Sequence, residues 1–225
     1  PPNSYDGDFL KLSVDNLDGV IKAAEGMDCI VNLSVLRTDR KLAFDVSTKG
    51  NYSMMEAARI NNIKRVINTG PHFQLVGQSY EERDYNLNPY MPAQPGTRLY
   101  AISKYLGQEI CKRYADQFGI QLITLLYYNM RHHLDLTTPD FEPAELHNDM
   151  TPFTTSWIDC GEAVRCAVDV SKERLASNKE TFFISPNIPH KKFNSEKTYK
   201  VLGWLPRYTL ENLWNKKIVS SDGHK

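Results

Sequence analysis

The sequence predicts a doubly wound α/β protein, in which helices cover both faces of a parallel β-sheet. Short apolar, β-branched runs have the length and continuity of strands that are buried on both faces. Segments with a helical spacing of apolar residues separate these runs. Alternation of strand and helix implies right-handed crossovers between parallel strands. With 225 residues, 41% of them hydrophobic, the chain can bury the core of one domain, with or without a small lobe.

Four segments are predicted to be strands. They are DCIVNLSV (28–35), RVINTG (65–70), QLITLLYYN (121–129) and TFFISP (181–186). Apolar residues run through each of them without the strict alternation of a strand that has one face in water, which favours a sheet covered on both sides.

Helices are predicted between the strands. Apolar residues recur with helical spacing over residues 16–26, 43–61 and 98–118, and a further helix begins near Asp159. The order strand, helix, strand, helix follows from these segments and gives the crossovers that a parallel sheet needs.

The regular pattern is interrupted after residue 130 by RHHLDLTTPDFEPAELHNDMTPFTTS, which is rich in Pro, Asp and Thr. A long insertion beyond a strand end is usually functional. We therefore expect a core in residues 1–130 and a small lobe in residues 131–225, from which residues 159–186 return to the core.

The composition excludes several classes of partner. Lys and Arg together number 27, as do Asp and Glu, so no global field attracts the chain to nucleic acid or to an anionic membrane surface. No stretch approaches the roughly 20 apolar residues of a membrane span, and PPNSYDGDFL lacks the features of a secretion signal. The sequence predicts a cytoplasmic protein with no nucleic acid or membrane partner.

Cysteine, histidine and tryptophan residues are not expected to form sites of their own. The cysteines lack CxxC spacing and are expected to be reduced core residues; they are Cys29, Cys111, Cys160 and Cys166. A polar segment contains histidines without the i, i+4 spacing of helical zinc ligands, so no metal is expected; the candidates are His132, His133, His147 and Asp149. The tryptophans are predicted to be packing anchors rather than a platform for a sugar; they are Trp157, Trp204 and Trp214.

A tyrosine and a lysine stand four residues apart in YAISKYLGQE (100–109). Residues i and i+4 share a helix face, so Tyr100 and Lys104 project together. A phenol with a pKa of about 10 is a poor acid or base at neutral pH unless a nearby positive charge favours the phenolate, and Lys104 is such a charge. Ligands of parallel sheets bind beyond the carboxyl ends of the strands. The pair is thus a candidate proton shuttle, although the same spacing also occurs by chance on many helices.

Five segments in chain order extend this motif. YAISKYLGQE matches Y-x-x-S-K-x-x-x-E, EGMDCIVNLSV is similar to G-x-D-x-V-x-H-x-A, and AFDVSTKGNYSMMEAARINNIKRVINTG is similar to the helix and strand that follow. LLYYN resembles L-R-Y-F-N, and KVLGWLPRYTLEN resembles a C-terminal L-G-W-x-P segment. Together they resemble the extended short-chain dehydrogenase/reductase family, of the NAD-dependent epimerase/dehydratase type. The resemblance implies a Rossmann-like core that binds NAD or NADP, a substrate-binding C-terminal lobe, and a sugar or sugar-nucleotide substrate.

The resemblance assigns roles at matching positions only. It implies that Tyr100 is the general acid/base and that Lys104 lowers the pKa of Tyr100 and holds the nicotinamide ribose. Ser47 stands where the family often has a cofactor-side Asn. Asp15 is a candidate for the acid that meets adenine, although Asp18 competes and either residue can instead cap a helix. The implied cofactor-side positions are Asp15, Leu33, Ser34, Ser47, Tyr100 and Lys104.

The third catalytic position departs from the family, which carries Ser or Thr just after the strand at RVINTG. Two ways of counting place Pro71 or His72 there. Thr69 is the nearest hydroxyl, with either a catalytic or a structural role. His72 is a candidate hydrogen-bond donor to the substrate, or else a loop or core histidine. Asn129 matches a family Asn that reaches the sugar, whereas Leu126 replaces the neighbouring family Arg.

The glycine-rich GxxGxxG turn that holds the pyrophosphate in the family is not found in this sequence. We therefore expect an N-terminally incomplete Rossmann-like sheet, from a truncation or from a natural short form. The alternatives to an active enzyme are a catalytically silent binding or regulatory protein and an incomplete gene product. A homodimer through helices 43–61 and 98–118 is a further implication of the resemblance.

Overall fold

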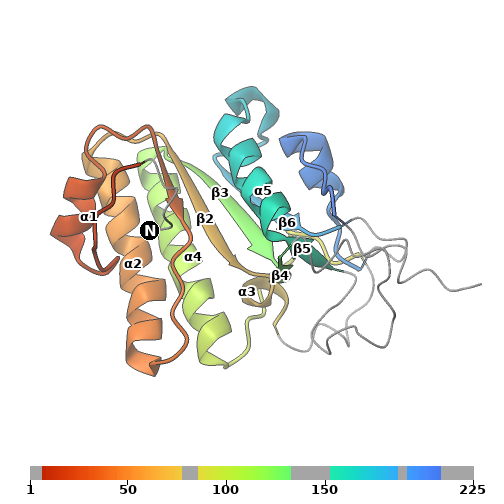
Figure 1. Ribbon diagram of the computed structural model, residues 1–225, viewed down its shortest axis with the longest axis horizontal. Helices are drawn as coiled ribbons and strands as arrows, with labels where there is room; N and C mark the ends of the chain where they lie inside the picture. The colour runs from red at the N-terminus through yellow and green to blue at the C-terminus, as the bar shows by residue number, and fades with distance from the viewer. Residues whose placement is uncertain (1–6, 78–85, 133–152, 187–191, 209–225) are drawn as a thin grey trace, which may run out of the picture.

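The computed structural model describes residues 7–77, 86–132, 153–186 and 192–208, and it confirms the parallel α/β fold (Figure 1). The main sheet has the strand order β1-β2-β3-β6, and all three pairs of neighbours are parallel. Its strands are β1 (Cys29–Asn32), β2 (Arg65–Pro71), β3 (Gln121–Tyr127) and β6 (Lys179–Ile184). Each lies in or overlaps a segment predicted to be a strand, so the four strand predictions are confirmed.

Helices cover both faces of this sheet. α2 (Arg40–Ile60) and α4 (Leu99–Phe118) lie side by side on one face, and α5 (Trp157–Asp169) packs on the other (Figure 1). α1 (Leu17–Ala23) packs on α2, and Asn16 begins it by accepting a hydrogen bond from the Gly19 amide. The predicted helices are therefore confirmed, with α2 starting three residues earlier than expected.

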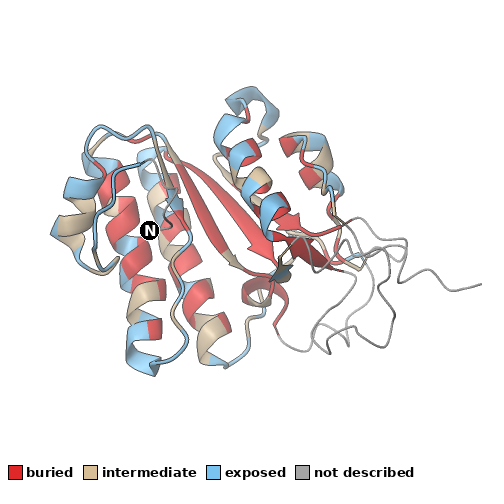
Figure 2. Ribbon diagram, viewed as in Figure 1, coloured by how far each residue is buried: buried red, intermediate tan, exposed pale blue. Residues whose placement is uncertain are grey.

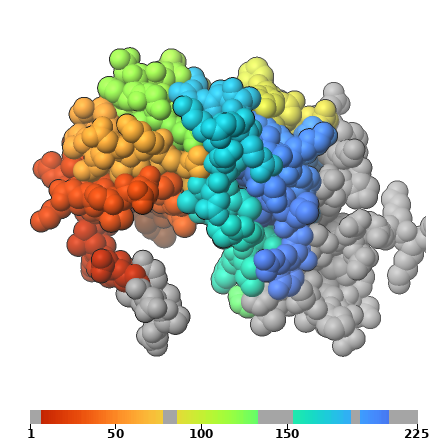
Figure 3. All heavy atoms as spheres, turned by 90° about the horizontal axis from the view of Figure 1, so that it is seen from above, coloured from red at the N-terminus to blue at the C-terminus, as the bar shows by residue number. Residues whose placement is uncertain are grey.

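Burial follows the layers, as Figure 2 shows. Under α2 and α4 the core contains Met54, Met55, Val66, Cys111 and Leu122, and under α5 it contains Ile67, Leu125, Ala163, Phe182 and Trp204. Figure 3, which views the molecule from above, shows the segments of α1 and α2 on one side and those of α5 and the following chain on the other.

α2 and α4 approach closely because a glycine stands at their contact. A Cβ at Gly107 of α4 would overlap the carbonyl oxygen of Ser47 on α2. Only a residue without a side chain fits here, so Gly107 sets how closely α4 packs against α2.

The later part of the chain adds smaller elements. β4 (Asn129–Arg131) and β5 (Thr154–Ser156) form a two-stranded parallel sheet, and α3 (Phe73–Val76), a 3-10 helix (Lys172–Arg174) and a π-helix (Thr198–Leu202) complete the described part of the chain. α5 and β6 lie largely in the segment that was expected to return to the core, and both pack there. The division into a core and a separate lobe stays a prediction.

All four cysteines are free thiols, as expected. Cys111, Cys160 and Cys166 are buried, and Cys29 is half-buried at the start of β1. In the described part of the chain, no helix combines the length and the apolar character needed to cross a membrane.

Candidate active site

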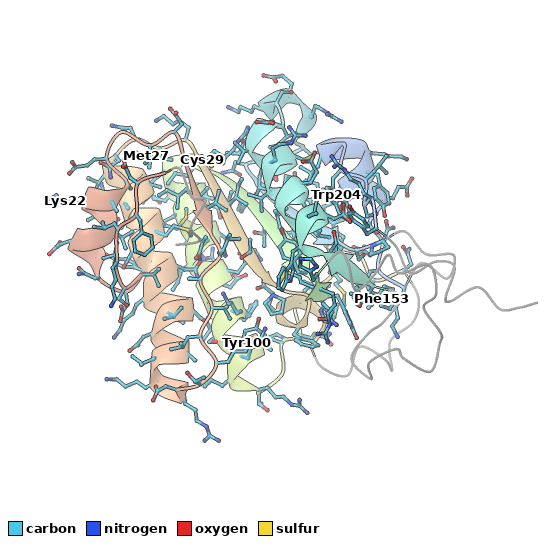
Figure 4. The ribbon with its side chains drawn as sticks, viewed as in Figure 1. Lys22, Met27, Cys29, Tyr100, Phe153 and Trp204 are labelled. Atoms are coloured by element: carbon cyan, nitrogen blue, oxygen red, sulfur yellow. The ribbon has the colours of Figure 1, made fainter. Side chains whose placement is uncertain are left out.

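A cavity of about 660 Å³ lies at the carboxyl ends of β1, β2 and β3. The loop after β1, the end of β2, the first turns of α4 and the segment joining β3 to β4 line it. Figure 4 shows Tyr100 at the end of the sheet opposite Met27 and Cys29, which lie at the amino-terminal end of β1. The cavity is therefore where a parallel sheet normally binds its ligands.

Tyr100 lines this cavity from the first turn of α4. Arg37, in the loop after β1, donates a hydrogen bond from Nη2 to the Tyr100 hydroxyl at 3.2 Å, and its guanidinium carbon lies 4.6 Å from the centroid of the tyrosine ring. Arg37 was not identified from the sequence, where its only signal is a basic residue shortly after Ser34.

Lys104 also lines the cavity, one helical turn after Tyr100, and is 5% exposed. Its Nζ donates to the Ser34 carbonyl oxygen at 2.7 Å. Burial lowers the pKa of Lys104 to about 8, with Cys111 opposing the shift and Arg37 adding to it. An ammonium has three N–H donors, and Ser34 is its single acceptor among the described residues, so two donors remain for a ligand.

Asn32, the last residue of β1, fixes the position of Ser34 by hydrogen bonds. Asn32 Oδ1 accepts hydrogen bonds from the Ser34 amide at 3.0 Å and from the Ser34 hydroxyl at 2.6 Å. The Thr69 hydroxyl donates to the Asn32 carbonyl oxygen at 2.7 Å. The loop that receives Lys104 is thus fixed to two neighbouring strands.

A row of polar side chains continues this network under α4. Asn32, Asn68 and Thr124 stand in register on β1, β2 and β3. Asn32 Nδ2 donates to Asn68 Oδ1 at 3.0 Å, and Asn68 Nδ2 donates to Gln108 Oε1 of α4 at 2.7 Å. Gln108 in turn donates to the Thr124 hydroxyl. These buried amides and hydroxyls bond one another, as buried polar groups must.

Five other predicted or considered positions lie at the cavity. Leu33, Ser34, Thr69, Pro71 and Asn129 all line it. The Thr69 hydroxyl donates its hydrogen bond to the Asn32 carbonyl oxygen, so toward a ligand its oxygen acts as an acceptor. Asn129 begins β4, and its Oδ1 accepts the Met130 amide at 2.9 Å.

Two predicted cofactor positions lie away from the cavity lining. Ser47 is 2% exposed in α2, where it faces α4. Asp15 precedes α1 and accepts a hydrogen bond from the Ser13 hydroxyl. Neither is among the residues that line the cavity, so their roles at the cofactor stay predictions.

His72 also lies away from the lining, although it follows β2 directly. It is 1% exposed and stacks on Tyr128, with the ring centroids 4.3 Å apart, beside Phe73 and Phe193. Burial lowers the pKa of His72 to about 3, so the ring is neutral at physiological pH. The structure places it as a core histidine, which was the alternative to a substrate ligand.

The tryptophan prediction is wrong for one residue. Trp204 is fully buried and donates from Nε1 to the Asp159 carbonyl oxygen at 2.9 Å, as a packing anchor does. Trp157 is 60% exposed at the start of α5 and lines the cavity, so its ring is available to a ligand. Trp214 lies outside the described residues.

No group of three His, Cys, Asp or Glu side chains suited to a metal occurs among the residues that the structure describes. His132 is described, and its ring lies 5.5 Å from that of Trp157. His133, His147 and Asp149 lie outside the described ranges.

A family model described as "NAD dependent epimerase/dehydratase family" matches residues 2–131. GDP-mannose 3,5-epimerase of Arabidopsis thaliana is 27% identical over 138 residues, which cover 55% of this chain and 35% of that protein. Uronate dehydrogenase of Agrobacterium fabrum is 30% identical over 98 residues, which cover 42% of this chain and 35% of that protein. The matched segments thus span about a third of these curated relatives.

Solved structures share the fold. A short-chain dehydrogenase/reductase superfamily protein from Agrobacterium tumefaciens with bound NAD has a TM-score of 0.74 at 14% identity, over 95% of this chain and 85% of that one. Glucuronic acid dehydrogenase from Chromohalobacter salexigens has a TM-score of 0.72 at 16% identity, over 100% of this chain and 78% of that one. These likenesses confirm the Rossmann-like fold.

Proposed function

Because this chain belongs to the NAD dependent epimerase/dehydratase family, we propose that it acts as an NAD(P)-dependent oxidoreductase or epimerase on a hydroxyl of a sugar or sugar nucleotide. One observation supports this function above the others. The Tyr100 phenol and the Lys104 ammonium, one turn apart on α4, line the same cavity at the carboxyl ends of the strands.

The residues at the cavity fit a nicotinamide dinucleotide on its ribose side. Lys104 has two N–H donors beyond its bond to Ser34, and a ribose diol offers two acceptors. Leu33 and Ser34 line the same wall, and the volume of about 660 Å³ lies within the range of small-molecule and cofactor sites. A bound nicotinamide supplies the hydride acceptor.

In the proposed reaction, Tyr100 takes the proton of the substrate hydroxyl while the hydrogen on the same carbon leaves as hydride. The O–H and C–H bonds break and a C=O bond forms, so the substrate is oxidised by two electrons. Lys104, one turn after Tyr100 on α4, is proposed to assist this proton transfer. Asn129 and Thr69 line the cavity, and we expect them to orient the sugar. In the reverse direction Tyr100 returns the proton, and an epimerase returns the hydride to the other face.

A catalytically silent binding protein is the second candidate. It is favoured by the end of β2, where Pro71 and the buried His72 stand in place of a free serine, and where the Thr69 proton is already bonded. A homodimer through residues 43–61 and 98–118 also remains a proposal.

Replacement of Tyr100 by Phe tests the enzyme. It removes one hydroxyl and keeps the ring, so we expect stability to change little and turnover to fall by a factor of about 10² to 10⁴. The assay is nicotinamide absorbance with NAD and NADP across a panel of sugars and sugar nucleotides. Tyr105→Phe makes the same change on α4 at a residue outside this cavity and should leave turnover unchanged. Retention of more than about a tenth of the activity by Tyr100→Phe would contradict the assignment.

A further inference from the structure

The charged side chains among the residues that line the cavity are all basic. Arg37, Arg40 and Lys104 line it, and none of the described lining residues is Asp or Glu. The chain as a whole has equal numbers of basic and acidic residues, 27 of each, so this is a local concentration of positive charge. A concave surface lined by one sign of charge attracts ligands of the other sign.

Among the described residues, neither arginine is neutralised by a neighbour. Within the described part of the chain, no ion pair involves Arg37 or Arg40. Asp39 lies between them in sequence, but its carboxylate caps α2 by accepting the Leu42 amide at 2.7 Å. Asp45, on the next turn of α2, pairs with Lys49 at 3.1 Å. Both guanidinium groups are therefore available to an incoming anion.

Arg37 is hydrogen-bonded to a hydroxyl, which is a weaker partner for a guanidinium than an anion is. Its Nη2 bonds the neutral phenol of Tyr100 at 3.2 Å, and the side chain is exposed. A guanidinium binds a carboxylate or phosphate through two parallel hydrogen bonds, which are shorter and about twice as strong as neutral ones. An anion in the cavity would give Arg37 a stronger partner than Tyr100, and the Tyr100 hydroxyl would then be free for the substrate.

We propose that the sugar substrate carries an anionic group, a carboxylate or a phosphate, close to the hydroxyl that reacts, and that Arg37 moves from Tyr100 to bind this group. Arg40 contributes a second positive charge at the same side of the cavity. The proposal rests on the proposed function and narrows its substrate class to acidic sugars.

The test compares matched substrate pairs. In each pair the acid carries an anionic group on the sugar ring and the partner called neutral carries none there, although the diphosphate of UDP-glucose is itself charged. Glucuronate against glucose, and UDP-glucuronate against UDP-glucose, are assayed at saturating cofactor, with glucose 6-phosphate as the phosphate arm. For the wild type we expect the acid to be preferred. For Arg37→Met we expect kcat/KM on the acid to fall about 10- to 100-fold, as for loss of a charge-assisted hydrogen bond, while the neutral partner changes less than about threefold. Arg113→Met removes the same charge from the exposed surface of α4, outside the cavity, and should change neither.

Several results would overturn the proposal. Equal losses on both members of a pair would show that Arg37 serves Tyr100 instead, and an increase confined to the KM of NAD would assign Arg37 to the cofactor pyrophosphate. A wild type without preference for the acid contradicts it directly. Calorimetric titration of the wild type and Arg37→Met with glucuronate and glucose keeps the two proposals apart. Selective glucuronate binding that depends on Arg37, without turnover, supports the anion site and rejects the proposed activity.

Discussion

The two faces of the sheet differ in kind. On the face under α4, three strands in register present Asn32, Asn68 and Thr124, which bond one another and Gln108. On the face under α5, the neighbouring positions are largely apolar and pack around Trp204.

Polar groups in a core stabilise little on balance but are costly when left unpaired, whereas apolar burial is the main favourable term in folding. The polar row ends at the cavity, because Asn32 holds Ser34 and Ser34 receives Lys104. We infer that the polar row under α4 positions the site. The apolar core under α5 supplies stability without touching that row, as does the apolar cluster elsewhere under α2 and α4.

Shortening a buried apolar side chain on the α5 face of the sheet should cause the largest loss of stability. Phe182 is fully buried there, with the Lys197 ammonium 4.6 Å from its ring centroid. We expect Phe182→Ala to lower the free energy of unfolding by about 3–5 kcal/mol, from lost burial and a residual cavity. Urea denaturation measures it, and Phe182→Leu should give a smaller loss. KM values measured well below the melting temperature should not move. A cost under about 1 kcal/mol, or altered KM values, would contradict the division between the faces.

A substitution in the polar row should cost less stability and more function. Asn68→Leu removes an acceptor from Asn32 and a donor from Gln108, and leaving such buried groups unpaired costs about 1–3 kcal/mol. We also expect kcat/KM to fall, because Asn32 then holds Ser34 less firmly. Thr181→Val, on the edge strand β6 opposite Thr124, is the matched control and should keep its activity. If Asn68→Leu loses stability but keeps the wild-type kcat/KM, the polar row does not position the site.

The sequence predicted the strands, the helices and the pair on α4 because these depend on local periodicity. Tyr100 and Lys104 are four residues apart, so a helix alone brings them together. The position of Arg37 beside Tyr100 joins residues far apart in the chain, and the bond from Lys104 to Ser34 does the same. No local pattern reports such contacts.

The remaining differences have the same physical origin. The apolar run in β2 does not say which residues face α4, so the polar row was not foreseen. His72 follows a strand end, where ligand residues gather, but α3 turns it inward against Tyr128. Trp157 was expected in the core because large aromatic residues usually lie there, yet it starts α5 at the cavity.

Substitution of Lys104 should give the smallest change in stability, and that change should be an increase. The reason is that the buried ammonium of Lys104 is unfavourable for folding, although the proposed function needs its charge. Burial lowers the pKa of Lys104 from 10.5 to about 8 in the folded chain. Between these pH values the unfolded chain binds more protons, so the stability of the wild type rises as the pH increases through this window.

Lys104→Met removes the buried charge and keeps an unbranched side chain. At pH 7 we expect it to raise the free energy of unfolding by on the order of 1 kcal/mol, after the lost bond to Ser34 is counted. This gain should shrink between pH 8 and 10.5, where the wild-type lysine loses its proton in the folded state. Turnover and cofactor affinity should fall together, since the same ammonium is proposed to assist Tyr100 and to hold the ribose. Urea denaturation at pH 7 and pH 10, with Lys112→Met on the partly exposed Glu109 pair as control, measures the stability effect. A variant that is less stable at pH 7, or a difference from the wild type that does not change with pH, would mean that folding does not oppose the charge on Lys104.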